Sequence, residues 1–520
     1  MMKNRLLNHA FVLLATVVVD VLNPLLVIAL ALFVSVGYLL TLLMPVDIYI
    51  WVLLLCGSVL APIPLLSYRA RQRWSARIAS AGSLDWRTIL PFIPLLIFAP
   101  LFFAELDQPG IQIIHHGDLH VGYIHNILYR PTPVDNIFFA GQPATYYWLY
   151  HAFLAALVEI TGAAPPLVAS VVNIVAILSG LLWLAQIIEG LGIAAKRSLM
   201  LGLVTVAVYC AVNATGVLSL VERFLDGSLQ AHSLHIMLLD GAEGRLHSTM
   251  GKVMNFTSMT LAMTCFIVGL HAAMAIAKGN MNRLALALTT SAWLVALAFQ
   301  PVVALFLLIV IPFGLLITGL LVGFGDSCGR LRLGIFWTYG ASKVGDKYLL
   351  AWLSLSAVLS LLLLRYVVQM AGNGSSSISF SQDLDFGISM IVAATLLYLP
   401  LFALQSMFLL KRNSPEECLI QIGSIVAILP AVLVALPDDN QYKLVFCLAI
   451  MLAISGFLAL KILLNSGNRA VRVAARVTCA LIFVLTFARI AFVKEYYDHR
   501  ALEWDFGYDG SHIDYYGDAF

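Results

Sequence analysis

Long runs of apolar residues repeat along almost the whole chain and are separated by short polar segments. An α-helix needs about 20 consecutive apolar residues to cross the hydrocarbon core of a bilayer. The pattern predicts thirteen transmembrane helices, over residues 20–43, 47–67, 88–104, 166–188, 199–217, 252–277, 283–299, 301–323, 348–370, 387–410, 417–436, 442–464 and 472–493. This is the pattern of an all-α polytopic membrane protein.

One further apolar segment, 146–161, is shorter than a usual span. It begins with aromatic and histidine residues, namely Tyr146, Tyr147, Trp148, Tyr150 and His151. Aromatic side chains concentrate at the membrane–water interface, where helices also lie parallel to the surface. We interpret the segment as a juxtamembrane helix on the outer face that does not cross the bilayer.

Composition agrees with this interpretation. Hydrophobic residues make up 61% of the chain and charged residues 11%, with a mean hydropathy of +0.93. Soluble domains carry about 25% charged residues. The net charge of +2 provides no strongly basic field, so we expect no nucleic-acid partner. The seven cysteines fall mostly inside apolar runs, which makes a disulfide framework improbable.

Basic residues predict the orientation of the chain, because loops rich in Lys and Arg stay in the cytoplasm. Six connecting segments carry them: Arg69, Arg71, Arg73, Arg77 and Arg87; Lys196 and Arg197; Lys278 and Arg283; Arg330, Arg332, Lys343 and Lys347; Lys411 and Arg412; Lys461, Arg469, Arg472 and Arg476. With all six inside, thirteen spans alternate without conflict. The prediction is a multi-pass protein of the cytoplasmic (inner) membrane, with the N-terminus inside and the C-terminus outside.

The larger polar segments then face outward, over residues 105–165 and 218–252. We expect function there, because the inner segments are short and basic. The sequence contains no P-loop, no dinucleotide fingerprint and no zinc-type Cys/His spacing. This disfavours an ATP-driven pump.

The first outer segment contains two acidic residues among several histidines. They are Asp118 and Asp135, with His115, His116, His120, His125 and His151. Glycosyl transfer needs a carboxylate that accepts the proton of the attacking hydroxyl, and some such enzymes also bind a divalent cation. In structural terms, Asp118 could instead cap a short helix starting at His120, and Asp135 after Pro133 could stabilise a turn. The histidines could pack at the interface.

This segment resembles a known family through several short matches. These are Asp118, the run His125–Leu128, Pro133–Asp135, Ala140–Gly141, Tyr146–Trp148 and His151, with a second similarity at Asp438–Phe446. It resembles the first extracytoplasmic loop of the GT-C superfamily of polytopic glycosyltransferases, and most closely the YYY-type membrane proteins. Here Trp148 stands in place of the third tyrosine, and the tryptophan usual after the second acidic residue is absent.

The resemblance implies a GT-C-like core over 88–493, preceded by a two-span extension over 1–87 and followed by an outer tail over 494–520. It implies inverting transfer of a sugar from a polyprenyl-phosphate donor to a glycan, lipid or protein acceptor. Asp118 corresponds to the catalytic base or metal ligand, and Asp135 is the second candidate carboxylate. A divalent cation, magnesium or manganese, would have Asp118 and His116 as its candidate ligands. His120, Tyr146, Tyr147 and His151 are the expected substrate contacts.

A polyprenyl-phosphate leaving group also requires cations at the outer boundary. Candidates near the outer ends of spans are Arg245, Lys252 and Lys443. Outer cations can equally snorkel toward lipid headgroups. Gln300–Pro301 separates two spans on the same side and could be only a tight turn.

A transporter or flippase of a lipid-linked or small polar substrate is the alternative function. Transporters usually show internal repeats and ionisable residues near the membrane midplane. The sequence shows no clear repeat and few charges within spans. This favours an active site at the surface, where an acyl- or phosphotransferase with an Asp/His pair is a third candidate.

Overall fold

The computed structural model of the chain describes residues 23–64, 66, 90–107, 118–137, 144, 147–211, 257–278, 283–325, 357–368, 379–380, 388, 391–392, 395, 397–408, 414–435 and 442–507. Within these residues the protein is helical, and the strand pairing is one antiparallel pair of two-residue strands, β1 (Ser379–Phe380) and β2 (Val434–Ala435). The expectation of an all-α fold is therefore confirmed.

Helices follow one another along the described chain, joined for the most part by short connections. The elements of the first part are α2 (Asn23–Leu43), α3 (Ile48–Leu60), η3 (Leu90–Phe98), α5 (Ala99–Asp107), α6 (Asp118–Tyr129), α7 (Trp148–Thr161), α8 (Pro165–Gly190) and α9 (Leu199–Tyr209). Those of the second part are α13 (Met259–Ala277), α14 (Arg283–Phe299), α15 (Pro301–Gly325), a helix over Ala357–Val368, α19 (Leu399–Phe408), α20 (Pro415–Leu433), α21 (Tyr442–Leu464) and α22 (Arg469–Gly507).

Seven described helices have spans long and apolar enough to cross a membrane. These are Asn23–Leu43, Pro165–Gly190, Met259–Ala277, Pro301–Gly319, Pro415–Leu433, Lys443–Leu464 and Arg469–Phe487. Shorter apolar helices occupy Ile48–Leu60, Leu90–Ala104, Trp148–Thr161, Leu199–Tyr209, Leu284–Phe299 and Ala357–Val368. A multi-pass membrane protein is thus indicated, whereas the number of thirteen spans stays a prediction.

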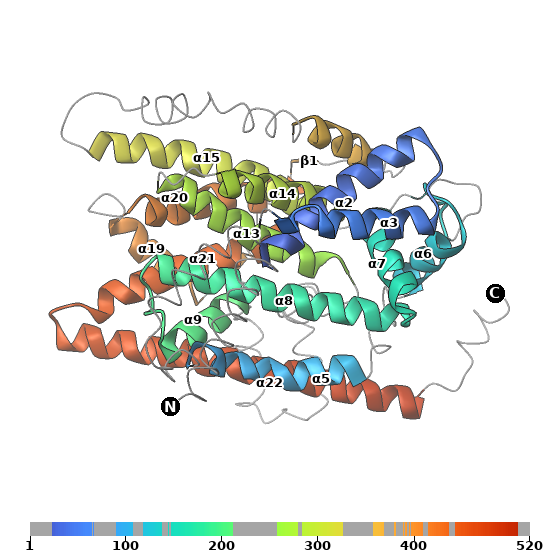
Figure 1. The fold of residues 1–520 in the computed structure, drawn as a ribbon. Coiled ribbons are helices and arrows are strands. Elements are labelled where there is room, and N and C mark those ends of the chain that lie inside the picture. The colour runs from blue at the N-terminus through green and yellow to red at the C-terminus, as the bar shows by residue number, and fades with distance from the viewer. Residues whose placement is uncertain are drawn as a thin grey trace, which may run out of the picture.

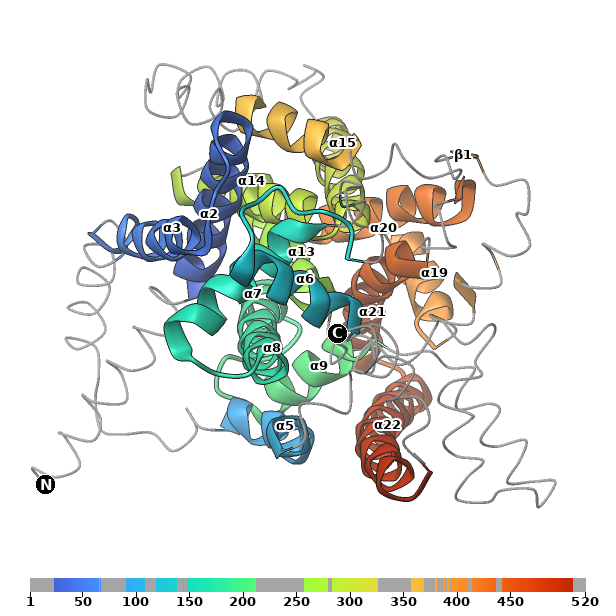
Figure 2. The ribbon, with the colours of Figure 1, turned by 90° about the vertical axis from the view of Figure 1, so that its right-hand side faces the viewer.

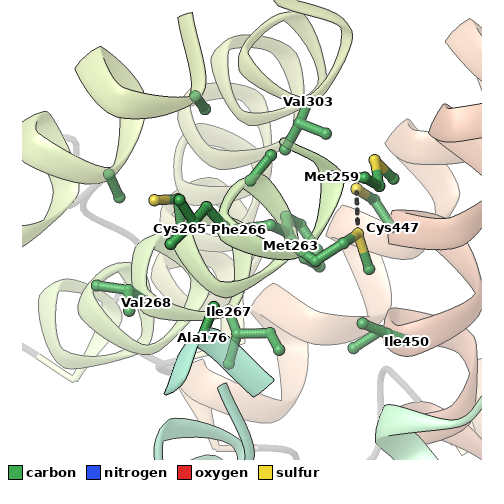
Figure 3. Packing of buried hydrophobic residues seen from close by; sticks show 14 of the residues in the cluster. Ala176, Met259, Met263, Cys265, Phe266, Ile267, Val268, Val303, Cys447 and Ile450 are labelled. Carbon is green, nitrogen blue, oxygen red and sulfur yellow. Dashed lines mark hydrogen bonds between the residues drawn. The ribbon is translucent and has the colours of Figure 1, made fainter. Parts of the chain in front are cut away.

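The long helices run side by side as one bundle (Figures 1 and 2). α13 lies at its centre and packs against α8, α14, α15 and α20. Nearly all of α13 is buried, and its Met259 and Met263 side chains lie toward α21, where Cys447 Sγ donates to Met263 Sδ over 3.8 Å (Figure 3). The six cysteines that the structure describes are all free, as the sequence predicted for them.

The predicted span 88–104 departs from a regular α-helix. It begins as the 3-10 helix η3 and continues as α5. Proline lacks the backbone N–H that an α-helix needs, and Pro94 lies inside η3. A side chain at Gly202 of α9 would collide with the Pro91 carbonyl and with Pro94, so glycine is what lets α9 lie directly on η3.

One end of the bundle is held by ion pairs, and we call it the basic end. Lys278 after α13 lies 2.9 Å from Glu416 of α20, and Lys461 of α21 lies 3.7 Å from Glu417. Lys461 also donates to the Leu191 carbonyl over 3.0 Å, and this hydrogen bond attaches the turn between α8 and α9 to the same end of the bundle. Two of the lysines that the sequence analysis assigned to the cytoplasmic side, Lys278 and Lys461, therefore lie at the same end of the bundle.

The opposite end carries α6 and α7, and we call it the aromatic end (right side of Figure 1). The start of α21 and the junction of α14 with α15 also lie there, joined by a hydrogen bond between Lys443 and Gln300. The described part of the two-span extension, α2 and α3, packs into the same hydrophobic core as the rest of the bundle.

Candidate functional site

α6 begins at Asp118 itself, two residues before the start that the sequence suggested. Helix ends commonly shift by one or two residues in this way. Asp118 therefore occupies the first turn of α6, at the aromatic end of the bundle. Its side chain lies outside what the structure describes, so its capping and catalytic roles both stay predictions.

A pair of buried histidines joins α6 to α7. His120 Nδ1 lies 2.7 Å from His151 Nε2, and the two rings stack with centroids 5.0 Å apart. Both side chains are buried, with Tyr123 5.2 Å from the His151 ring and Tyr150 edge-on to it. The pair therefore holds the first turn of α6, which contains Asp118, against α7.

The His151 ring is neutral in this setting. Burial lowers the pKa of His151 from 6.5 to about 3, while its hydrogen bond with the Tyr147 backbone acts in the opposite direction. A neutral imidazole has one N–H and one acceptor nitrogen. One ring of the pair must therefore donate and the other accept, which fixes the two tautomers relative to each other.

The start of α7 is fixed by contacts to distant parts of the chain. The Tyr366 hydroxyl, on the helix Ala357–Val368, accepts from the Leu149 backbone N–H over 3.3 Å. Trp148 packs edge-on against Tyr366 at 5.7 Å and against Trp51 of α3 at 6.1 Å. α7 is thus a rigid support, and the sequence analysis did not identify Tyr366 or Trp51 as part of it.

Asp135 lies in the segment that follows α6, with its side chain exposed. Its backbone carbonyl accepts from Asn126 Nδ2 over 3.2 Å. Three residues earlier, Thr132 forms a bridge with Val46 and its hydroxyl accepts from Trp51 Nε1 over 3.1 Å. The backbone at Asp135 is thus attached to α6 through Asn126, and its side chain is exposed, so its role in stabilising a turn stays a prediction.

Lys443 lies where three helices begin. Its Nζ donates to Gln300 Oε1 over 3.4 Å, and Gln300 is only 4% exposed. α15 begins at the next residue, and the start of α13 is attached through Ser258 Oγ, which donates to the Phe299 carbonyl over 2.6 Å. Helix N-termini carry partial positive charge and favour anions. This corner of the aromatic end therefore suits a phosphate.

The histidine pair and the Lys443 corner are connected through aromatic side chains. Tyr150 lies 5.5 Å from the His151 ring and 5.5 Å, edge-on, from Phe299. Phe299 directly precedes Gln300, the partner of Lys443. A continuous set of contacts thus runs from α6 through α7 to the start of α21. The sequence analysis missed Tyr150 and Phe299 as links, because apolar runs give no signal of which aromatic residues meet.

Of the remaining predicted site residues, one is described by the structure and four are not. Tyr147 directly precedes α7 and is partly exposed, with its backbone bonded to His151. Four predicted site residues fall outside the described part of the chain, namely His116, Tyr146, Arg245 and Lys252. Among the residues that the structure does describe, no three His, Cys, Asp or Glu side chains gather in a way that could hold a metal ion. The predicted ligands, Asp118 and His116, are not covered by that search.

Comparison with known proteins adds no family to this picture. No protein-family model matches the chain, and no curated protein matches it significantly. The multi-pass helical architecture follows from the helices themselves.

Proposed function

We propose that the protein is a membrane glycosyltransferase of the GT-C type, which transfers a sugar from a polyprenyl-phosphate donor to an acceptor hydroxyl on the outer face of the inner membrane. One observation carries the proposal. The helix that begins with Asp118 is fixed through the buried His120–His151 pair to the same end of the bundle as Lys443 and three helix N-termini. A carboxylate and an anion-binding corner are the two elements that this transfer needs.

In the proposed reaction the acceptor hydroxyl oxygen attacks the anomeric carbon of the donor. The bond between that carbon and the phosphate oxygen breaks, and polyprenyl phosphate leaves with the electron pair. Asp118 takes the hydroxyl proton, and attack from the side opposite the phosphate inverts the configuration. Lys443 and the adjacent helix N-termini stabilise the charge of the departing phosphate. The histidine pair and Tyr150 position the first turn of α6.

In the proposed reaction the protein's own side chains carry out each step. Asp118 and His116, the candidate ligands of a divalent cation, lie outside the side chains searched for metal sites, and the proposed steps use only the groups named above. Asp118 acts as the base, and exposed Asp135 is the second carboxylate near the acceptor. The acceptor is a hydroxyl group of a glycan, a lipid or a protein.

The test is sugar transfer by purified protein in proteoliposomes, with a panel of polyprenyl-phosphate sugars. Asp118→Asn should reduce transfer by a factor of about 100 or more, which is typical of a lost general base. Asp47→Asn is the matched control. Asp47 caps α3 at the same end by accepting from the Ile50 N–H, and asparagine caps equally well, so activity should be retained.

The alternative function, a transporter or flippase, is favoured by one observation. Polar side chains lie between α8 and α13 within the bundle, where Thr264 Oγ1 donates to the Ala176 carbonyl over 2.7 Å. The same proteoliposomes separate the two functions. If wild-type protein transfers no sugar and hydrolyses no donor, but moves a lipid-linked or polar substrate across the bilayer, the glycosyltransferase proposal is wrong.

A further inference from the structure

One turn of α8, deep in the bundle, is surrounded by polar side chains from three other helices. Ser179 of α8 donates its hydroxyl to Asn23 Oδ1 of α2. Tyr209 of α9 lies against Gly180, where an added Cβ would be 3.1 Å from the tyrosine ring. His271 of α13 packs on Trp183, with ring centroids 4.7 Å apart. We call these residues the α8 polar turn.

These side chains share one face of α8. Successive helical residues point about 100° apart, so Trp183 points between the directions of Ser179 and Gly180. The partners of all three positions, Asn23, Tyr209 and His271, are therefore gathered around the same side of one helical turn. Four helices, α2, α8, α9 and α13, thus contribute to one small region.

Four polar atoms of this region have no hydrogen-bond partner among the residues that the structure describes. They are Asn23 Nδ2, Trp183 Nε1, Tyr209 Oη and His271 Nδ1. Asn23, Trp183 and Tyr209 are exposed by only 4%, 3% and 1%. Native proteins rarely leave buried donors unsatisfied, and bound water is the usual partner of those that the protein itself does not satisfy. Within a bilayer the rule is stricter, because lipid tails offer no partner.

The chemistry of the four atoms defines the ligand. Asn23 Nδ2 and Trp183 Nε1 can only donate, while the Tyr209 hydroxyl and the His271 ring can donate or accept. The ligand must therefore accept hydrogen bonds from Asn23 and Trp183, and it can donate to or accept from Tyr209 and His271. Asn, Trp and Tyr side chains carry no charge, so a free ion would have little compensation for its desolvation. A small neutral ligand that both accepts and donates fits this set.

We propose that the α8 polar turn is an internal water-binding site within the membrane-spanning bundle. Bound water would satisfy Asn23, Trp183 and Tyr209 and would hydrate His271, an ionisable residue inside the span Met259–Ala277. Ionisable groups inside membranes are seldom purely structural. Hydration of the His271 imidazole would not depend on whether the protein is a glycosyltransferase.

The first experiment is hydroxyl-radical labelling by X-ray radiolysis, read out residue by residue by mass spectrometry. Radicals form from water molecules at the site, so a buried residue beside bound water is labelled. Trp183 should be oxidised several-fold faster than Trp51, which is equally buried but donates its Nε1–H to Thr132. Equal and slow labelling of Trp183 and Trp51 would overturn the proposal.

A second experiment removes one hydroxyl without changing side-chain shape. Tyr209→Phe should lower both the Tm and the labelling of Trp183, because a water ligand is lost. If the Tyr209 hydroxyl contacts no water, the same substitution removes an unsatisfied polar group and raises the Tm instead, which would contradict the proposal. Tyr398→Phe is the control, since the Tyr398 hydroxyl donates to the Ala207 carbonyl over 3.3 Å; it should lower the Tm without changing labelling of Trp183.

Discussion

The two ends of the bundle are held together by different chemistry. At the basic end, adjacent carboxylates at the start of α20 each meet a lysine from the end of another helix, as Glu416 meets Lys278 and Glu417 meets Lys461. At the aromatic end, the corresponding contacts are the stacked His120–His151 pair and the hydrogen bond from the charged Lys443 to the uncharged Gln300 amide.

This difference separates the charges that pair within the protein at the basic end from the charge of Lys443, which has a proposed role in binding the donor phosphate. At the basic end, acidic residues lie at a helix N-terminus and lysines at helix C-termini, so each charge also interacts favourably with the helix dipole. In such ion pairs each charge is compensated by its partner. The Lys443 ammonium donates to the Gln300 amide, and under the proposed function it would also contact the donor phosphate. We therefore expect substitutions at the basic end to change stability alone, and substitutions at the aromatic end to change both stability and the proposed sugar transfer.

The largest expected effect is on the support of the aromatic end. His151→Ala should destabilise the protein by about 3 kcal/mol, because it empties a buried ring site and removes the partner of His120. Thermal unfolding in detergent measures it. His125→Ala, on the exposed face of α6, is the control and should cost less than about 0.5 kcal/mol. Equal losses would mean that the histidine pair does not hold α6.

At the basic end, Lys278→Ala should destabilise the protein by about 2 kcal/mol. The Glu416 side chain is only 7% exposed and would be left without its cation. Lys196→Ala breaks a pair whose side chains are 71% and 36% exposed, so it should cost less than about 1 kcal/mol. Denaturation of both variants gives the comparison. If the double variant Lys278→Ala, Glu416→Gln is no more stable than Lys278→Ala, the buried charge is not the cause.

Stability should also depend on pH through His151. Its folded pKa of about 3 lies below the ordinary 6.5, so between these values the unfolded chain binds a proton that the folded protein does not. Stability from this ring is complete above pH 6.5 and falls toward acid by about 1.4 kcal/mol per pH unit. Melting at pH 7 and pH 5 tests it. In His151→Phe the fall should be smaller, and an unchanged pH dependence would contradict the assignment.

The smallest expected effect concerns the anion-binding corner. Lys443→Gln should raise the KM for a polyprenyl-phosphate sugar about fivefold, equivalent to about 1 kcal/mol, because the phosphate loses one cation. Lys443→Arg retains the charge and should lie near wild type. Transfer kinetics in proteoliposomes measure both. A Lys443→Gln protein with unchanged KM would show that the lysine only reaches toward lipid headgroups.

Helix positions were predictable from hydropathy, because spanning helices require long apolar runs wherever they lie in the bundle. The predicted short helix at 146–161 is α7, and the break at Gln300–Pro301 separates α14 from α15. Details that depend on backbone chemistry were harder to predict from the sequence. The 3-10 start of the 88–104 segment follows from Pro94, whose effect hydropathy does not register.

The contacts of the candidate site could not be predicted from sequence. His120 and His151 both look like polar residues near an interface, and only the packing of α6 on α7 brings His120 Nδ1 within 2.7 Å of His151 Nε2. Lys443 and Gln300 are separated by 143 positions in the chain, so no local pattern pairs them. The α8 polar turn escaped notice for the same reason, since its residues lie singly in apolar runs where a search for charges passes over them.

The last described helix is much longer than a bilayer requires. α22 has 39 residues, which corresponds to about 58 Å at about 1.5 Å per residue, against a hydrocarbon core of about 30 Å. A continuous helix that crosses once from Arg469 must therefore project well beyond the far membrane surface. Deleting one residue from the projecting part would bring Gly507 about 1.5 Å closer to the membrane surface and rotate it by about 100° about the helix axis.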